Sequence, residues 1–238
     1  AVKDDEIYVL EVNPRASRTI PYLSKSTGIP LVEIATKVML GKKLREIEIP
    51  NPKKKIFAIK QPIFSFEKFN RADPKLGPEM RSTGEVVGIG RSFGESFAKS
   101  FIGVFNKIPT GGKVLITVNE PDKPKVVPIA WELKELGFSI VTTEGTGEYL
   151  KRNHLEVEIV KKIHEGSPNP IDLIEKGEVC LLINTPLGRD SQFDDYHIRR
   201  KALENRIPYT TTISAARCLV EAIRELKEKG LDVLPITD

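Results

Sequence analysis

The sequence lacks long apolar segments. No apolar run reaches the ~18 residues that a transmembrane helix needs. Residues 1–6, which read AVKDDE, show none of the features of a secretory signal peptide. Hydrophobic residues still make up 39% of the 238 residues, which is enough for a folded core. We therefore expect a soluble cytoplasmic protein with no membrane partner.

Cysteine is scarce, since the chain contains only two. Cys180 lies in the apolar run 179–183, and Cys218 lies in a helical pattern beside Leu219. This number and spacing exclude a disulfide framework and a metal site built from paired cysteines. Both residues are predicted to be small buried hydrophobic side chains.

A large excess of charge of one sign is also absent. The 37 basic and 33 acidic residues are interspersed and give a net charge of +4. The one dense cluster is lysines 53–55, which follow a turn at Asn51 and Pro52 and are expected to form a solvated loop. Because nucleic-acid binding usually needs a basic stripe on one face, we expect no nucleic-acid partner.

The chain does not begin with Met, and it opens in the middle of a predicted hairpin. A turn at Asp4 and Asp5 separates a shortened first strand from a second strand over residues 7–12. A length of 238 residues suits one domain together with part of another. We therefore expect a fragment of a larger protein.

Two regions differ in their patterns. Residues 1–105 mix the hairpin with predicted helices at 30–40 and 92–101, as in an α+β region. From residue 106 to residue 238, five apolar runs alternate with helical patterns, which predicts an α/β domain with a doubly wound parallel sheet. The breaker-rich stretch 106–112 marks the boundary. The predicted strands are 114–118, 138–142, 157–160, 179–183 and 209–213, and the predicted helices are 125–136, 147–153, 171–176, 196–205 and 215–229.

In the first region, Glu11 and Asn13 follow an apolar run. Residues i and i+2 of a strand share a face, so a carboxylate and an amide oxygen would lie side by side, as suits Mg²⁺. Arg15 and Arg18 would then supply donors for phosphate oxygens. The alternative is a solvated strand end with a turn at Asn13 and Pro14, and the spacing alone does not decide between them.

In the second region, ligands of a parallel sheet are expected at the carboxyl ends of its strands. Residues 142–147, which read TTEGTG, follow the second strand and lead into a helix, so Thr143 and Thr146 could form a phosphate cradle with the helix N-terminus. The alternative for both threonines is simple N-capping. Further polar residues follow the first, third and fourth strands, namely Lys123, Lys162 and Asn184. His164 and Glu165 are expected to have a structural role in a loop.

The first region resembles a known enzyme. Residues 11–31, EVNPRASRTIPYLSKSTGIPL, and residues 76–86, LGPEMRSTGEV, resemble the second ATP-grasp domain of the carbamoyl-phosphate synthetase large subunit. The resemblance implies that Glu11 and Asn13 bind Mg²⁺ or Mn²⁺ at the second ATP site. It further implies that Arg15 and Arg18 act in catalysis by steadying phosphoryl oxygens. The family's nucleotide-gripping lobes lie upstream, so this chain alone should not carry out ATP-dependent synthesis.

The second region resembles the methylglyoxal-synthase-like domain at the end of the same subunit. The matching motifs are Thr143-x-x-Thr146, KIHEG at 162–166, INT at 183–185 and IRRKAL at 198–203. The resemblance implies a regulatory domain that binds UMP or IMP, with ornithine at the edge against the preceding region. The implied nucleotide-binding residues are Lys123, Thr143, Thr146, Lys162 and Asn184, and Tyr209 and Thr211 match the ornithine contacts.

The sequence departs from the family at two positions. Pro186 stands where ornithine-responsive relatives carry a threonine, and Gln61 stands where they carry a glutamate facing the ornithine amine. A neutral amide binds an ammonium group less strongly, because charge-assisted hydrogen bonds are about twice as strong as neutral ones. We expect inhibition of the UMP type to be retained and activation by ornithine to be weak or missing.

Three functions follow from these observations. The first is a regulatory and partly catalytic piece of a carbamoyl-phosphate synthetase, whose partners would be the rest of the large subunit and a glutaminase small subunit, in an oligomer. The second is a free-standing methylglyoxal synthase, but the stretch 165–169, EGSPN, lacks the Gly-Gly-Asp loop that supplies its base. The third is a pure interaction module, but nothing in the sequence identifies a surface for such a role.

Overall fold

The computed structural model describes residues 1–52, 56–68, 74, 80–185 and 192–233. The chain divides into two compact units, one of residues 1–55 with 235–238 and one of residues 56–234. Lysines 53–55, Pro186 and part of the 76–86 motif lie outside the described residues. No described helix is long and apolar enough to cross a membrane.

The first unit begins with a short hairpin of β1 (Val2–Lys3) and β2 (Glu6–Ile7). Asp4 and Asp5 have φ values of 52° and 61°, which places the predicted turn where the sequence indicated it. The prediction that the second strand continues to residue 12 is wrong, because β2 ends at Ile7. Beyond this strand, Ala1 and Tyr8 still exchange two backbone hydrogen bonds, and residues 8–12 are described without strand structure.

Two helices follow in the first unit, α1 (Thr19–Thr27) and α2 (Leu31–Met39). Helix α1 ends at Gly28, which adopts a left-handed conformation and donates its N–H to the Ser24 carbonyl. Helix α2 confirms the helix predicted at 30–40, whereas α1 was not predicted. A 3₁₀ turn, η1 (Leu44–Glu46), completes the described elements of this unit.

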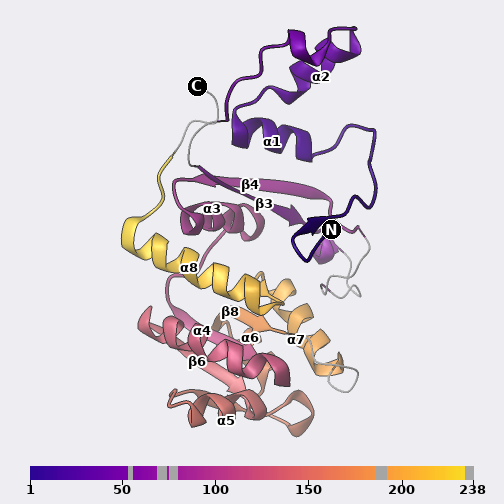
Figure 1. Ribbon diagram of the computed structural model, residues 1–238. Coiled ribbons are helices and arrows are strands. Elements are labelled where there is room, and N and C mark those ends of the chain that lie inside the picture. The colour runs from indigo at the N-terminus through magenta and orange to yellow at the C-terminus, as the bar shows by residue number, and fades with distance from the viewer. Residues whose placement is uncertain (53–55, 69–73, 75–79, 186–191, 234–238) are drawn as a thin grey trace. The chain divides into compact units, whose positions relative to one another are not determined.

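The second unit opens with an antiparallel pair of strands, β3 (Phe57–Ile63) and β4 (Gly84–Gly90). Helix α3 (Phe93–Phe105) packs against both strands (Figure 1). Gly88 allows this close packing, since a Cβ at that position would lie 2.0 Å from the carbonyl oxygen of Ser96. The helix begins at Ser92, whose hydroxyl accepts the N–H of Glu95.

A five-stranded parallel sheet forms the rest of the second unit, with the order β7-β6-β5-β8-β9. This confirms the predicted doubly wound sheet. The strands are β5 (Gly112–Thr117), β6 (Phe138–Thr143), β7 (Glu158–Val160), β8 (Val179–Asn184) and β9 (Tyr209–Thr210). The helices are α4 (Lys123–Glu135), α5 (Glu144–Arg152), α6 (Pro170–Glu175), α7 (Gln192–Glu204) and α8 (Ile213–Lys229), and the 3₁₀ turns are η2 (Phe66–Lys68), η3 (Glu120–Asp122) and η4 (Ile163–Glu165).

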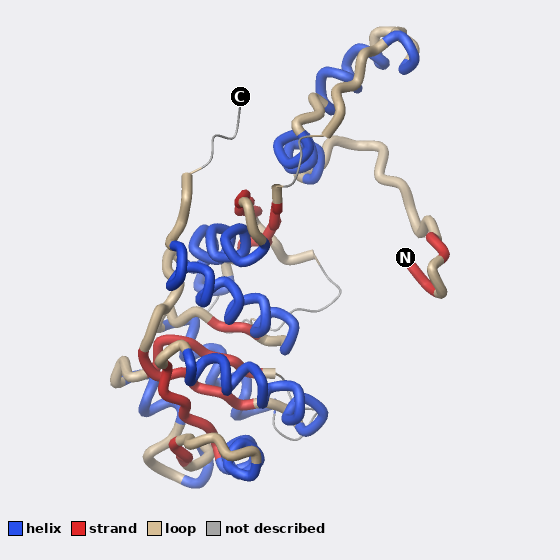
Figure 2. Tube along the Cα trace, turned by 60° about the vertical axis from the view of Figure 1, so that its left-hand side comes forward, coloured by secondary structure: helices blue, strands red, loops and turns tan. Residues whose placement is uncertain are grey.

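Helices cover both faces of this sheet (Figure 2). Along β5, Val114 and Ile116 belong to one buried cluster and Leu115 belongs to the other. This alternation follows from the opposite directions of successive strand side chains. The first cluster includes residues of α3, α4 and α8, and the second includes residues of α6 and α7. The parallel sheet is therefore the central layer of this unit.

Helix α3 precedes residue 106, yet it packs on α8 within the same compact unit. The two helices approach closely at Gly94, where an added Cβ would lie 3.0 Å from the Cβ of Glu225. The domain boundary predicted at residue 106 remains a prediction, which these contacts alone do not test.

Two local predictions need correction. The last strand was expected to extend to residue 213, but β9 ends at Thr210, because the Thr212 hydroxyl accepts the N–H of Ala215 and starts α8. Cys180 and Cys218 are free and only partly buried, rather than fully buried. Burial still raises the pKa of Cys180 to about 11.

Candidate functional site

A small cavity of about 70 Å³ lies at the carboxyl ends of the central strands. Three of the predicted effector-binding residues meet there, namely Thr143, Thr146 and Lys162. We call this cavity the cradle. Among the described residues, its lining is Thr117, Val118, Thr143, Thr146, Lys162, Ile163, Pro170, Asp194, Asp195 and Ile198.

The two threonines lie at the N-terminus of α5. Thr143 occupies the N-cap position with an extended backbone, but its side chain makes no capping hydrogen bond. Thr146 is buried in the first turn, and its hydroxyl accepts the N–H of Val118 at 3.2 Å. Neither threonine side chain therefore acts as a simple N-cap of α5. The first backbone N–H groups of α5 have no partner within the helix.

Two lysines flank this helix start. The Lys123 ammonium group lies 3.6 Å from the position that a Cβ on Gly145 would take, so it lies over the first turn of α5. Its side chain is 14% exposed and pairs with Glu120 at 2.5 Å. Lys162 lines the cradle itself, and its backbone N–H donates to the Glu165 carboxylate at 2.8 Å. One ammonium group thus lies over the first turn of α5, where the helix dipole also favours an anion, and a second lysine lines the cradle.

Asn184 lies behind the cradle at the end of β8 and is fully buried. Its amide nitrogen donates to the Thr117 hydroxyl at 2.7 Å and to the Asp195 carboxylate at 2.8 Å. Its amide oxygen accepts from the Arg199 guanidinium at 2.7 Å. The structure thus places the Asn184 side chain in a buried network rather than in the lining of the cradle. Its assignment as an effector-binding residue remains a prediction.

Sequence reasoning missed the contribution of α7 to this site. Asp194 and Asp195 line the cradle, and Arg199 is 1% exposed beneath it. Arg199 lies in the IRRKAL motif at 198–203 that resembles the family, but the spacing of the two aspartates and Arg199 is also that of ordinary surface ion pairs, so the motif alone did not place them at this site. His164, which was expected to be structural, lies within 3.2 Å of Asp194, from Nδ1 to Oδ2.

A second, larger cavity of about 940 Å³ lies within the same unit. It brings together Gln61, Tyr209 and Thr211, which the sequence placed at an ornithine site. The Tyr209 ring meets Phe105 edge to face, with ring centroids 5.6 Å apart. Among the described lining residues, Glu204 is the one acidic side chain, and it accepts from Arg200 at 3.1 Å.

In the first unit, Glu11 and Asn13 lie side by side although neither is in a strand. The Asn13 amide nitrogen donates to the Glu11 carboxylate at 3.2 Å, and both side chains are exposed. Exchanging the oxygen and nitrogen of this amide would bring two oxygens together, as a Mg²⁺ ion requires. Among the described residues, no group of three or more His, Cys, Asp or Glu side chains is placed to hold a metal. The pair would supply at most two oxygen ligands, and its binding of Mg²⁺ remains a prediction.

Arg15 and Arg18 lie near this pair in the sequence. Arg18 occupies the N-cap position of α1, and no acidic residue lies in the first turn of that helix. The backbone turns sharply before it, since the Arg15 N–H donates to the Asn13 carbonyl at 2.8 Å. Two guanidinium groups and a helix N-terminus thus occur within a short stretch of chain, a combination that suits phosphoryl oxygens.

Two family models match the chain. Residues 1–47 match the ATP-binding domain of the carbamoyl-phosphate synthase L chain, and residues 125–211 match the MGS-like domain. The carbamoyl phosphate synthase large chain, C-terminal section, of Methanopyrus kandleri is 48% identical over 97% of this chain. The chain belongs to the carbamoyl phosphate synthase large-chain family. It corresponds to the C-terminal part of that chain, with a piece of an ATP-binding domain and an MGS-like domain.

Other members of the carbamoyl phosphate synthase large-chain family show the same relation. The large chain of Methanoregula boonei is 45% identical over 100% of this chain, and the C-terminal section of Aquifex aeolicus is 44% identical over 98%. This chain spans 44% of the Methanopyrus kandleri protein, 48% of the Aquifex aeolicus protein and 22% of the Methanoregula boonei protein. The chain is thus less than half the length of these relatives.

Proposed function

We propose that this chain is the regulatory and partly catalytic C-terminal part of a carbamoyl phosphate synthase. The complete enzyme would make carbamoyl phosphate from bicarbonate, ammonia released from glutamine, and two ATP, for pyrimidine and arginine synthesis. The rest of the large chain and a glutaminase small subunit would be its partners, in a cytoplasmic oligomer. The convergence of Thr143, Thr146 and Lys162 on one cavity at the start of α5 carries the regulatory part of this proposal.

The cradle has the chemistry of a nucleotide monophosphate site. A phosphate group would accept from the first backbone N–H groups of α5 and from the Thr143 hydroxyl, with Lys123 and Lys162 balancing its charge. Asp194 and Asp195 also line this cavity. The Asp194 carboxylate would suit sugar hydroxyls and base N–H groups, which are hydrogen-bond donors, whereas the Asp195 carboxylate already accepts from the Asn184 amide. UMP and IMP each contain a phosphate group, a sugar with hydroxyl groups and a base with an N–H group.

The larger cavity is less suited to ornithine. Its amine would need a carboxylate, but Gln61 is neutral, and Glu204 already accepts from Arg200 and lies 3.8 Å from the Lys201 ammonium. Tyr209 and Thr211, which match the ornithine contacts of the family, line this cavity. We therefore propose nucleotide regulation with little or no response to ornithine.

The first unit would contribute to the second ATP site. Glu11 and Asn13 would bind Mg²⁺ or Mn²⁺, and Arg15 and Arg18 would steady the transferred phosphoryl group. Bound metal would neutralise charge that develops on the phosphate oxygens. The remaining nucleotide-binding residues would come from upstream parts of a complete large chain, so this chain alone should be inactive in synthesis.

Calorimetric titration of the chain tests the regulatory assignment. UMP, IMP and ornithine would be added separately, with inorganic phosphate as the reference anion. We expect UMP or IMP to bind, and we expect Thr143→Ala and Lys162→Ala each to weaken it at least about tenfold, because each removes a bond to a charged phosphate.

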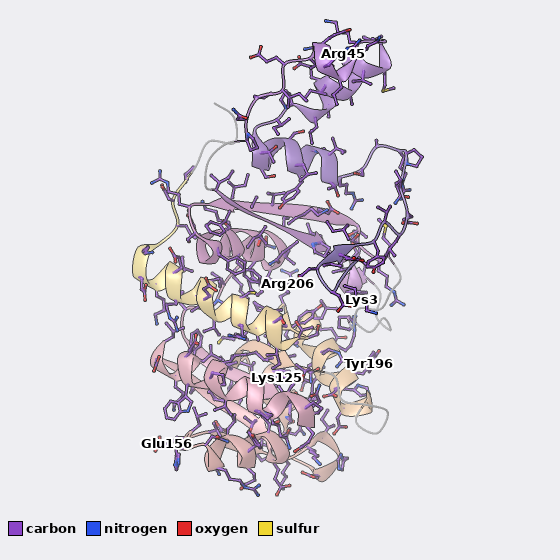
Figure 3. The ribbon with its side chains drawn as sticks, viewed as in Figure 1. Lys3, Arg45, Lys125, Glu156, Tyr196 and Arg206 are labelled. Carbon is purple, nitrogen blue, oxygen red and sulfur yellow. The ribbon has the colours of Figure 1, made fainter. Side chains whose placement is uncertain are left out.

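Lys125→Ala is the matched control. Lys125 lies on α4 (Figure 3), pairs with Asp122 at 3.0 Å and is not among the described residues that line the cradle. This variant should bind like the unchanged chain. The proposal fails if neither nucleotide binds, or if the control weakens binding as much as the two cradle variants do.

A further inference from the structure

Helix α7 contacts both cavities of the second unit. Its first half contributes to the cradle and its second half contributes to the larger cavity. The residues of the first half are Asp194, Asp195 and Ile198, and those of the second half are Arg200, Leu203 and Glu204. One rigid element of 13 residues thus lies against two separate binding spaces.

The first half of α7 is fixed to the sheet by buried polar contacts. Asp195 and Arg199 are one helical turn apart, and both bond to Asn184, at 2.8 and 2.7 Å. Asn184 also bonds to Thr117 at 2.7 Å, so the ends of β5 and β8 are included. In a buried setting, an unmade bond to a charged group is costly. A ligand that displaces Asp195 would therefore move the helix together with its network rather than one side chain.

The second half of α7 is fixed to a different part of the chain. Arg200 is 6% exposed and donates to the Phe66 carbonyl at 3.0 Å, while its Nε donates to Glu204 at 3.1 Å. Phe66 begins η2, three residues after the end of β3, and its own side chain is buried. The planar guanidinium group holds both partners in one fixed geometry. Arg199 and Arg200, adjacent in sequence, thus bond to different parts of the second unit.

We propose that α7 couples the two cavities, with Arg200 as the positioning residue that transmits the state of the cradle to residues 57–66. This inference rests on the proposed nucleotide binding at the cradle. Residues 57–63 form β3, which pairs with β4 and packs on α3, so a change at Phe66 would reach the part of the unit before residue 106. By reciprocity, a ligand in the larger cavity would change nucleotide affinity at the cradle by the same factor.

Hydrogen exchange of the 238-residue chain, followed by mass spectrometry with and without UMP, tests the coupling. We expect UMP to slow exchange in residues 143–152 and also, by about fivefold or more, in residues 57–66. In Arg200→Met, the protection of 143–152 should remain and the protection of 57–66 should be lost. Lys201→Met is the control, because Lys201 pairs with Glu175 of α6, at 2.7 Å, and not with residues 57–66.

A second arm needs no ligand. Asp195→Ala breaks the network at the cradle end, so exchange in residues 57–66 should rise severalfold in the otherwise unchanged chain. The same substitution should add nothing further in Arg200→Met. Residues 158–160, in the edge strand β7, should be unaffected and serve as the internal reference.

The outcomes separate the two proposals. If UMP and IMP fail to bind, the proposed effector site is wrong, and the Asp195→Ala arm alone decides the coupling. If UMP protects 143–152 but not 57–66, or if Asp195→Ala leaves 57–66 unchanged, the coupling is wrong. If Arg200→Met unfolds the chain, Arg200→Lys replaces it, because that variant keeps the charge but loses the two-pronged contact. Unchanged protection of 57–66 by UMP in that variant would also overturn the proposal.

Discussion

Replacing Asn184 with alanine should destabilise the second unit strongly. The side chain is fully buried and makes three hydrogen bonds of 2.7–2.8 Å, to Thr117, Asp195 and Arg199. Two of these partners carry charge. The substitution leaves all three partners buried without the group that they face, and the small alanine side chain offers no replacement.

The size of the effect follows from these contacts. An unmade bond in a buried site costs about 1–3 kcal/mol, with the upper values for charged groups. Water entering the space left by the amide would offset part of the cost of the three lost bonds. We therefore expect a loss of about 3–5 kcal/mol in the free energy of unfolding. For a unit of this size, that corresponds to a fall in the melting temperature of roughly 6–20 °C.

Thermal and urea unfolding followed by circular dichroism would measure this loss. Asn205→Ala is the control, because Asn205 makes one exposed bond to the Lys201 carbonyl, at 2.9 Å. That variant should lose about 0.5–1 kcal/mol or less. If Asn184→Ala costs no more than Asn205→Ala, the buried network does not stabilise the fold as argued.

Two further predictions concern packing and pH. Gly88→Ala should destabilise the chain by several kcal/mol or prevent folding, because the added Cβ would lie 2.0 Å from a carbonyl oxygen of α3. Gly111→Ala is the control in the same unfolding assay and should have little effect, because the space around Gly111 is open. The Ser167 hydroxyl and the Asn169 N–H both donate to Asp172, and they lower the pKa of that carboxyl. A lowered pKa stabilises the fold above the unfolded-state value of about 3.9 and ceases to do so as the pH falls through the folded-state value. The difference in melting temperature between the unchanged chain and Asp172→Asn should therefore shrink as the pH falls below about 4, and a constant difference would contradict this account.

The parallel sheet could be predicted because its strands are buried on both faces. Such strands leave continuous apolar runs, and the alternating helical patterns then fix the class of fold. The strands β3 and β4 could not be predicted in the same way. Pro62 lies inside β3, and Gly84, Gly88 and Gly90 interrupt β4, so both segments have the composition of loops. Their pairing with each other and their packing against α3, neither of which is visible in the local sequence, make them strands.

The candidate site was predicted as far as the topology of the sheet determines it. Thr143, Thr146 and Lys162 follow strands whose carboxyl ends meet, so the order of the strands is enough to bring them together. The roles of Asp195 and Arg199 depend on how α7 is rotated about its axis. That rotation is set by their shared bonds to Asn184, which is distant in sequence, and no local pattern reveals it.

The packing of α3 on α8 has a practical consequence for anyone who shortens this chain. A piece that begins at residue 106 would keep all five parallel strands, but it would leave the surface of α8 without the helix that covers it. Phe101 is 2% exposed and belongs to the same apolar cluster as Leu219 of α8. Uncovering such a surface favours self-association, which would mask weak nucleotide binding. A piece that begins at residue 56 keeps this surface covered and is the better starting point for binding studies.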